Sequence, residues 1–141
     1  MKVSILTNEF PPNIYGGAGV HVDYLTRELQ KLTDVDVMAF GDQNFKSEHL
    51  VANGFKSWDK LKGDGVAKCL EPFSINLDMI KNFPKDSKLV HCHTWYTFMA
   101  GYLAKVVFNI PLVVTTHSLE PLRPWKAEQL GPCLLYTSRC V

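Results

Sequence analysis

The sequence has 141 residues, a formal net charge of +1 and an apolar content of 46%, which is ordinary for a globular protein. This length suffices for one domain with its own hydrophobic core. The near-zero charge provides no basic field for nucleic acid, and no run is long and apolar enough to cross a bilayer. No secretory leader is recognisable, and the four cysteines form no C-x-x-C pair. We therefore expect a soluble cytoplasmic protein without a membrane or nucleic-acid partner.

The first part of the chain predicts a parallel βαβ unit. Residues 2–7 are short and β-branched, which is typical of a strand. Residues 20–32 carry apolar side chains at helical spacing, from Val22 to Leu32. Residues 34–40 predict a second strand, which a helical crossover would place parallel to the first.

A proline pair and then Gly16, Gly17 and Gly19 lie between the first strand and the first helix. Glycine lets backbone N–H groups approach a ligand closely, and the N-terminus of a helix favours anions. We interpret this segment as a phosphate-facing loop, with a simple tight turn as the alternative. The dinucleotide pattern G-x-G-x-x-G fails because its third glycine position is Val22, and no Gly-Lys-Ser or Gly-Lys-Thr follows.

The middle of the chain gives weaker patterns. Residues 47–53 and 57–61 predict short helical pieces, with an irregular segment as the alternative, and residues 67–73 predict a short strand. Residues 74–82 predict a helix with Ser74 as its N-cap.

The second half repeats the strand-and-helix alternation. Residues 88–94 predict a strand and residues 95–107 a largely buried helix, because both faces of that helix are apolar. Residues 112–116 are nearly all apolar, as in the middle of a parallel sheet. A loop at 117–123 and a helix at 124–130 follow. This order predicts an α/β fold with a doubly wound, Rossmann-like parallel sheet, in which ligands bind at the carboxyl ends of the strands.

Three histidines lie near those carboxyl ends. His91 and His93 alternate along one strand and therefore share a face, and His117 directly follows the next strand. We expect a structural role for His91 and a ligand-binding role for His117, and either role fits His93. His-x-His with His117 would make part of a metal site, but no carboxylate or thiolate stands at matching spacing and Cys92 faces the other way. We expect no metal ion.

The last residues differ in character from the rest. Residues 133–141 resemble the translation of two back-to-back transposase adapter ends used in sequencing-library preparation. On this interpretation residues 132–141 are a non-native tail. A genuine C-terminal strand is the alternative. We expect residues 1–131 to be the N-terminal domain of a longer protein, cut short.

Four stretches together resemble glycogen and starch synthases, which are retaining glycosyltransferases with the two-domain GT-B fold. They are LTNEFPP (6–12), YGGAGVHV (15–22), VHCHTWY (90–96) and THSLEPLRPWK (116–126). The resemblance covers residues 1–131, and its last stretch is the most specific for glucan synthesis. One departure is Tyr15, where many members of the family carry a lysine.

The resemblance implies transfer of glucose from ADP-glucose to the non-reducing end of an α-1,4-glucan, with retention of configuration and without a metal ion or cofactor. It assigns the donor to Gly16, Gly17 and Gly19, catalysis to His117 beside the transferred glucose, and the acceptor or sugar to Trp95, Tyr96, His93, Glu120 and Arg123. A hydrogen bond from His117 to a sugar hydroxyl would support the cationic sugar of the transition state.

In this family the arginine and lysine that neutralise the leaving diphosphate belong to the C-terminal domain. We therefore expect the 141-residue chain to bind donor weakly and to be inactive by itself. Three alternatives stay open: a retaining GT-B transferase that uses a UDP- or GDP-sugar, an enzyme that makes maltose 1-phosphate from glucose 1-phosphate, and a non-catalytic sugar- or nucleotide-binding module.

Overall fold

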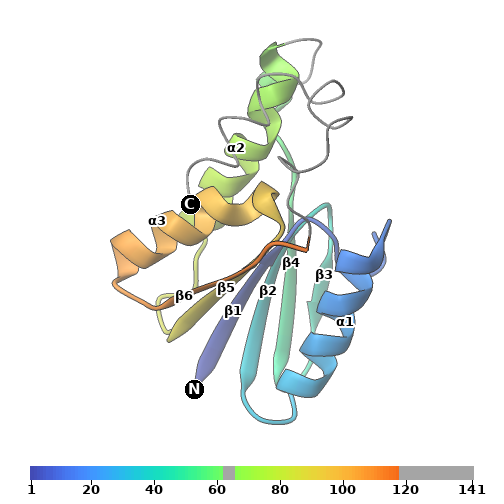
Figure 1. The fold of residues 1–141 in the computed structure, drawn as a ribbon, viewed down its shortest axis with the longest axis vertical. Coiled ribbons are helices and arrows are strands. Elements are labelled where there is room, and N and C mark those ends of the chain that lie inside the picture. Colours follow the sequence, from blue (N-terminus) through green and yellow to red (C-terminus); the bar gives the residue numbers. More distant parts are fainter. Residues whose placement is uncertain (62–65, 118–141) are drawn as a thin grey trace.

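A six-stranded sheet is the centre of the computed structural model, which describes residues 1–61 and 66–117, the side chains of residues 66–69 excepted (Figure 1). The strand order is β3-β4-β2-β1-β5-β6. The strands span Lys2–Thr7 (β1), Asp34–Phe40 (β2), Asn44–Lys46 (β3), Leu50–Phe55 (β4), Leu89–His93 (β5) and Leu112–Thr115 (β6). Neighbouring strands are parallel except β3 and β4. Because β2 and β5 flank β1, the carboxyl ends of β1 and β5 frame a topological switch point.

Helices cover both faces of this sheet. Helix α1 (Gly17–Leu29) lies on one face, and α2 (Val66–Lys81) and α3 (Phe98–Phe108) lie on the other (Figure 1). Two short 3₁₀ turns complete the elements, η1 (Asp59–Leu61) and η2 (Trp95–Thr97). The predicted doubly wound α/β fold is confirmed.

Side chains of the central strands alternate between two hydrophobic layers. Ile5 and Val37 pack in the layer under α1, whereas Leu6 and Met38 pack in the layer under α2 and α3. Successive side chains of a strand point to opposite faces, so β1 and β2 are buried on both sides. Both strands are accordingly buried over almost their whole length, and their predicted bounds are confirmed.

Helix α1 begins and ends three residues earlier than the sequence predicts. Gly17 and Gly19 lie in its first turn, so the loop proper ends at Gly16. Leu29 packs against the core, but Leu32 lies beyond the helix and is exposed. The apolar spacing continued past the end of the helix, and the prediction for Leu32 was wrong.

The middle of the chain contains the largest corrections. Residues 47–53, predicted as helical, mostly belong to β4, which pairs with β2. A strand pairing can override weak local preference. The piece predicted at 57–61 is only η1. The strand predicted at 67–73 is wrong, because α2 runs through Pro72, and Ser74 is no cap: its hydroxyl donates to the Glu71 carbonyl at 2.8 Å.

Helix α3 is less buried than predicted. Ala100, Gly101 and Ala104 face the sheet, and a Cβ on Gly101 would overlap the Cys92 Sγ, so the close approach requires glycine. Tyr102 and Val106 are exposed on the other side of the helix. Strand β6 lies at the end of the described sheet rather than in its middle, which is why none of its residues is fully buried and Val113 is exposed.

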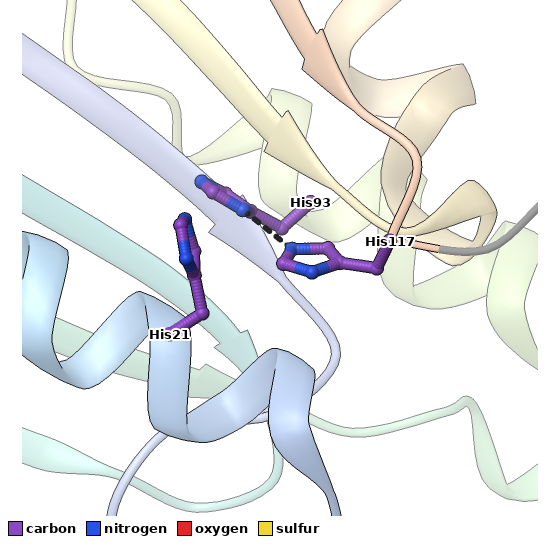
Figure 2. Close-up of side chains that lie close together, drawn as sticks. All are labelled: His21, His93 and His117. Atoms are coloured by element: carbon purple, nitrogen blue, oxygen red, sulfur yellow. Dashed lines mark hydrogen bonds between the residues drawn. The ribbon is translucent and has the colours of Figure 1, made fainter.

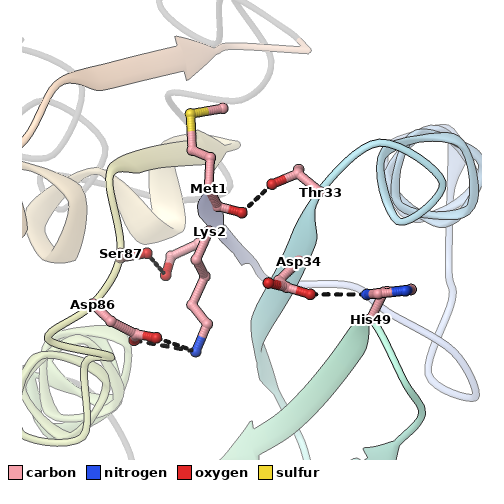
Figure 3. Close-up of polar contacts among 8 residues, drawn as sticks. Met1, Lys2, Thr33, Asp34, His49, Asp86 and Ser87 are labelled. Carbon is pink, nitrogen blue, oxygen red and sulfur yellow. Dashed lines mark hydrogen bonds and ion pairs between the residues drawn. The ribbon is translucent and has the colours of Figure 1, made fainter.

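Polar contacts close the opposite edge of the sheet, where the strands begin (Figure 3). Lys2 forms an ion pair with Asp86 at 2.9 Å, and Ser4 is hydrogen-bonded to Ser87 at 2.5 Å. These contacts leave the carboxyl edge as the place for ligand chemistry.

Residues 118–123, 124–130 and 132–141, for which the sequence predicts a loop, a helix and a non-native tail, lie outside the described residues. Over the described ranges, none of the helices has the length and apolar character to span a membrane.

Candidate functional site

Three segments meet at the carboxyl edge of the sheet: residues 8–16 after β1, residues 94–97 after β5, and residues 116–117 after β6. The Thr94 hydroxyl donates to the Asn8 side-chain oxygen at 2.9 Å, and the Thr97 hydroxyl donates to the Leu6 carbonyl at 3.2 Å. These bonds join the first two segments directly at the switch point, which is where doubly wound sheets bind their ligands.

The glycine loop presents backbone donors to a negative charge. The N–H groups of Tyr15 and Gly16 donate to one carboxylate oxygen of Glu9, at 3.0 and 2.8 Å. Gly16 is the N-cap of α1, is extended, and makes no side-chain capping bond. A carboxylate therefore already occupies the anion-favouring start of this helix.

The glycines differ in what they do. A Cβ on Gly19 would lie 2.8 Å from the Glu9 Oε2 and 3.1 Å from the Ile14 Cγ2, so Gly19 lets the loop fold against the helix. A Cβ on Gly17 would meet nothing within 4 Å. Gly16 and Gly17 are exposed, which leaves the outer side of this turn open to a ligand.

Three imidazoles from three elements converge beside this loop: His21 of α1, His93 of β5 and His117 after β6 (Figure 2). The His93 Nδ1 and the His117 Nε2 are hydrogen-bonded at 2.9 Å. The His21 ring lies 5.1 Å from that of His117 and 5.6 Å from that of His93, centroid to centroid. Because His21 is one turn into α1, this cluster brings His117 close to the glycines.

Burial keeps the inner histidines neutral. His93 is fully buried, and burial, together with the neighbouring imidazoles, lowers its pKa to about 3. Burial also lowers the pKa values of His91 and His117, and the Glu9 carboxylate partly opposes the change at His117. His91 is hydrogen-bonded to the Thr115 hydroxyl at 2.8 Å, inside the sheet. At neutral pH His117 therefore offers an uncharged hydrogen-bonding ring.

The backbone at this edge is held in unusual conformations. Thr94 has φ +66° and His117 has φ +54°, both in the left-handed region that non-glycine residues adopt at a cost of about 1–3 kcal/mol. Thr94 directly follows β5, and His117 lies two residues after the end of β6. Such conformations persist where the surrounding contacts hold them, as the Thr94–Asn8 and His117–His93 bonds do here.

Trp95 and Tyr96 form a stacked aromatic pair directly after Thr94, at the end of β5. Their rings stack at 3.9 Å between centroids, and Tyr96 meets Phe40 edge to face at 6.3 Å. Below them the buried Asn76 of α2 donates to the Tyr96 carbonyl at 2.7 Å and accepts from the Ala100 N–H at 2.7 Å. These hydrogen bonds of Asn76 hold the backbone of the aromatic pair in place.

The structure brings two of the predicted residues, His93 and His117, into direct contact near the start of α1, and it stacks two others, Trp95 and Tyr96, on each other after β5. The predicted residues Gly16, Gly17 and Gly19 lie at the start of α1, at the same carboxyl edge of the sheet. Glu120 and Arg123 lie outside the described residues. Sequence analysis missed His21, which looked like part of a solvated helix face, and gave no role to Glu9. The signal for His21 was its position in the second turn of a helix that starts at the carboxyl edge.

Comparison with known proteins connects this site to a family. Residues 15–137 match the profile of glycosyltransferase family 4. The chain belongs to glycosyltransferase family 4. The match begins at the glycine loop and includes the aromatic pair Trp95 and Tyr96 as well as His117.

Named relatives agree with this membership. The family 4 chain is 47% identical over 131 residues to α-maltose-1-phosphate synthase of Mycolicibacterium smegmatis and 45% identical to that of Mycobacterium tuberculosis. These alignments cover 93% of this chain and 32% of each relative, so the chain spans about a third of their length.

Among solved structures, sucrose-phosphate synthase from Thermosynechococcus elongatus superposes with a TM-score of 0.68. The superposition covers 96% of this chain and 38% of the synthase, at 18% identity. This likeness concerns the fold, which is that of the N-terminal half of a GT-B glycosyltransferase.

Proposed function

We propose that this chain is the acceptor-side domain of a retaining glucosyltransferase that moves glucose from ADP-glucose to glucose 1-phosphate and forms α-maltose 1-phosphate. The observation that carries the proposal is the convergence of the glycine loop and His117 at one edge of a family 4 sheet. The product follows from the relatives at 47% and 45% identity, which are α-maltose-1-phosphate synthases. These relatives favour this acceptor over the α-glucan that the sequence resemblance implies.

In the proposed mechanism the glycine loop receives the donor diphosphate. The N–H groups of Tyr15 and Gly16 are already aimed at a negative charge, that of Glu9. A diphosphate oxygen would replace the carboxylate there, and the start of α1 would stabilise the charge that grows on the leaving group. The open side of Gly17 gives the donor room to approach.

His117 would act on the glucose itself. Its lowered pKa keeps the ring neutral, so it can hydrogen-bond a sugar hydroxyl without placing a positive charge beside the cationic transition state. The His93 hydrogen bond fixes the direction of that ring. Trp95 and Tyr96 would line the acceptor side, where aromatic rings suit the apolar face of a sugar.

A chimera tests the proposal directly. Residues 1–131 replace the matching 131 residues of the M. smegmatis relative, and the purified protein is given ADP-glucose with either glucose 1-phosphate or a linear α-1,4-glucan. We expect maltose 1-phosphate as the product and a loss of turnover of about 100-fold in His117→Ala, the size found for one lost transition-state donor. The matched control is His49→Ala, which alters an exposed histidine at the opposite edge of the sheet.

Other outcomes distinguish the alternatives. Elongation of the glucan without maltose 1-phosphate would favour the glycogen or starch synthase assignment, which the specific stretch 116–126 supports. A folded chimera that binds sugar but transfers none with either acceptor would favour a non-catalytic module. Activity only with a UDP- or GDP-sugar would overturn the assignment of ADP-glucose as the donor. The 141-residue chain alone should release no ADP above background.

A further inference from the structure

The three converging histidines have a geometry that the transfer reaction does not account for. One nitrogen of each ring, from His21, His93 and His117, lies within 4.8 Å of the other two. Figure 2 shows the rings directed toward a common point from α1, β5 and the segment after β6. Hydrogen bonding to a sugar hydroxyl requires one imidazole, whereas this arrangement supplies three.

The inner histidine has a nitrogen without a partner. His93 is fully buried, and its Nε2 makes no hydrogen bond within the described part of the chain, while its Nδ1 is bonded to His117. An unpaired buried polar atom is costly. If the Nδ1 that faces His117 binds an ion, this Nε2 carries the ring proton. The centroid of the His91 ring lies 4.1 Å from that of His93, with the two rings tilted by 39°, and His91 is hydrogen-bonded to the Thr115 hydroxyl.

The three imidazole nitrogens determine which class of metal ion fits. Imidazole nitrogen suits Zn²⁺, Cu²⁺ and Ni²⁺, whereas Mg²⁺ and Ca²⁺ require oxygen ligands. With Zn–N bonds of about 2.0–2.1 Å, two ligands of a tetrahedral ion stand roughly 3.3 Å apart. The His93 Nδ1 and the His117 Nε2 are 2.9 Å apart, so the two rings need to separate only slightly to bind one ion. The Cys92 thiol lies on the opposite face of β5, where it contacts the segment before α3.

We propose that His21, His93 and His117 bind one divalent transition-metal ion, with Zn²⁺ as the best fit, and leave a fourth position for water or ligand. His21 and His117 are exposed, so the ion can enter from solvent, and the buried His93 forms the floor of the site. The ion is not needed for glucosyl transfer. If the proposed function holds, the ion competes with the donor glucose for His117, which makes the site inhibitory.

Binding of Zn²⁺ to the 141-residue chain provides the test. Equilibrium dialysis followed by atomic emission gives stoichiometry and Kd, and Co²⁺ replacing Zn²⁺ reports tetrahedral nitrogen ligation by its visible absorption. We expect one ion per chain, and a Kd raised at least about tenfold in His21→Ala. His21 is an exposed helix residue, so its loss should leave the circular dichroism spectrum unchanged.

His49→Ala is the matched control. His49 is also exposed, but it lies at the opposite edge of the sheet, where it is hydrogen-bonded to Asp34 at 2.9 Å (Figure 3). All four cysteines stay in every variant, so ion held by thiols would be common to all. The proposal is overturned by a Kd weaker than about 100 µM in the unaltered chain, or by equal losses in His21→Ala and His49→Ala. Because no sugar is present, neither result bears on the transferase proposal.

Discussion

Replacing Asp36 with asparagine should stabilise the protein at neutral pH. Asp36 lies on β2, is almost fully buried, and its Oδ1 has no hydrogen-bond partner within the described residues. Burial raises its pKa from 3.8 to about 6, although the Lys2 ammonium opposes the change. At 1.36 kcal/mol per pH unit this amounts to about 3 kcal/mol, and we expect about 2–3 kcal/mol after relaxation of the site.

The sign of the pH dependence follows from linkage. Because the native pKa of Asp36 lies above the unfolded value of 3.8, ionisation destabilises the native state. The free-energy cost of ionising Asp36 in the native state is absent below about pH 3.8, grows as the pH rises to about 6, and is constant above that. Urea unfolding of wild type and Asp36→Asn at pH 7 should therefore differ by about 2–3 kcal/mol, and the difference should vanish near pH 4.

Asp34 supplies the matched control on the same strand. It is exposed, and its hydrogen bond to His49 lowers its pKa (Figure 3). Asp34→Asn should therefore leave stability unchanged or reduce it slightly. Equal unfolding free energies for Asp36→Asn and wild type at pH 7 would refute the reasoning, as would a gain of the same size in Asp34→Asn.

Two further predictions concern the site. Because the native pKa of His93 is about 3, the unfolded chain takes up a proton before the native chain does as the pH falls below 6.5. The free energy of unfolding therefore decreases from pH 6.5 toward pH 3. With a chelator present, His93→Gln should reduce the slope of unfolding free energy against pH by up to about 1.4 kcal/mol per pH unit. Gly19→Ala should destabilise the chain by about 1–3 kcal/mol through its clash with Glu9, whereas Gly17→Ala should change stability by less than about 1 kcal/mol. Urea titrations measure both, and a larger loss in Gly17→Ala than in Gly19→Ala would contradict the packing assigned to the loop.

Local pattern was least informative where a segment depends on a neighbour. Residues 50–55 contain Asn53 and Gly54, which weaken any strand preference, yet they form β4 because β2 offers a parallel edge. Residues 66–81 form one helix despite Pro72, because the helix packs its apolar face on the sheet beside α3. In both cases a contact distant in sequence decided the element.

The sequence by itself determined the strand cores at 2–7, 34–40, 89–93 and 112–115, and with them the doubly wound sheet and the edge at which ligands bind. Those features follow from side-chain periodicity and from the handedness of βαβ crossovers, which are local rules. Only the tertiary structure decided that the polar face of α1 turns His21 toward His93 and His117, and that Glu9 fills the glycine loop. The reason is physical: periodicity tells which side chains share a face, but the packing of one element on another decides what that face meets.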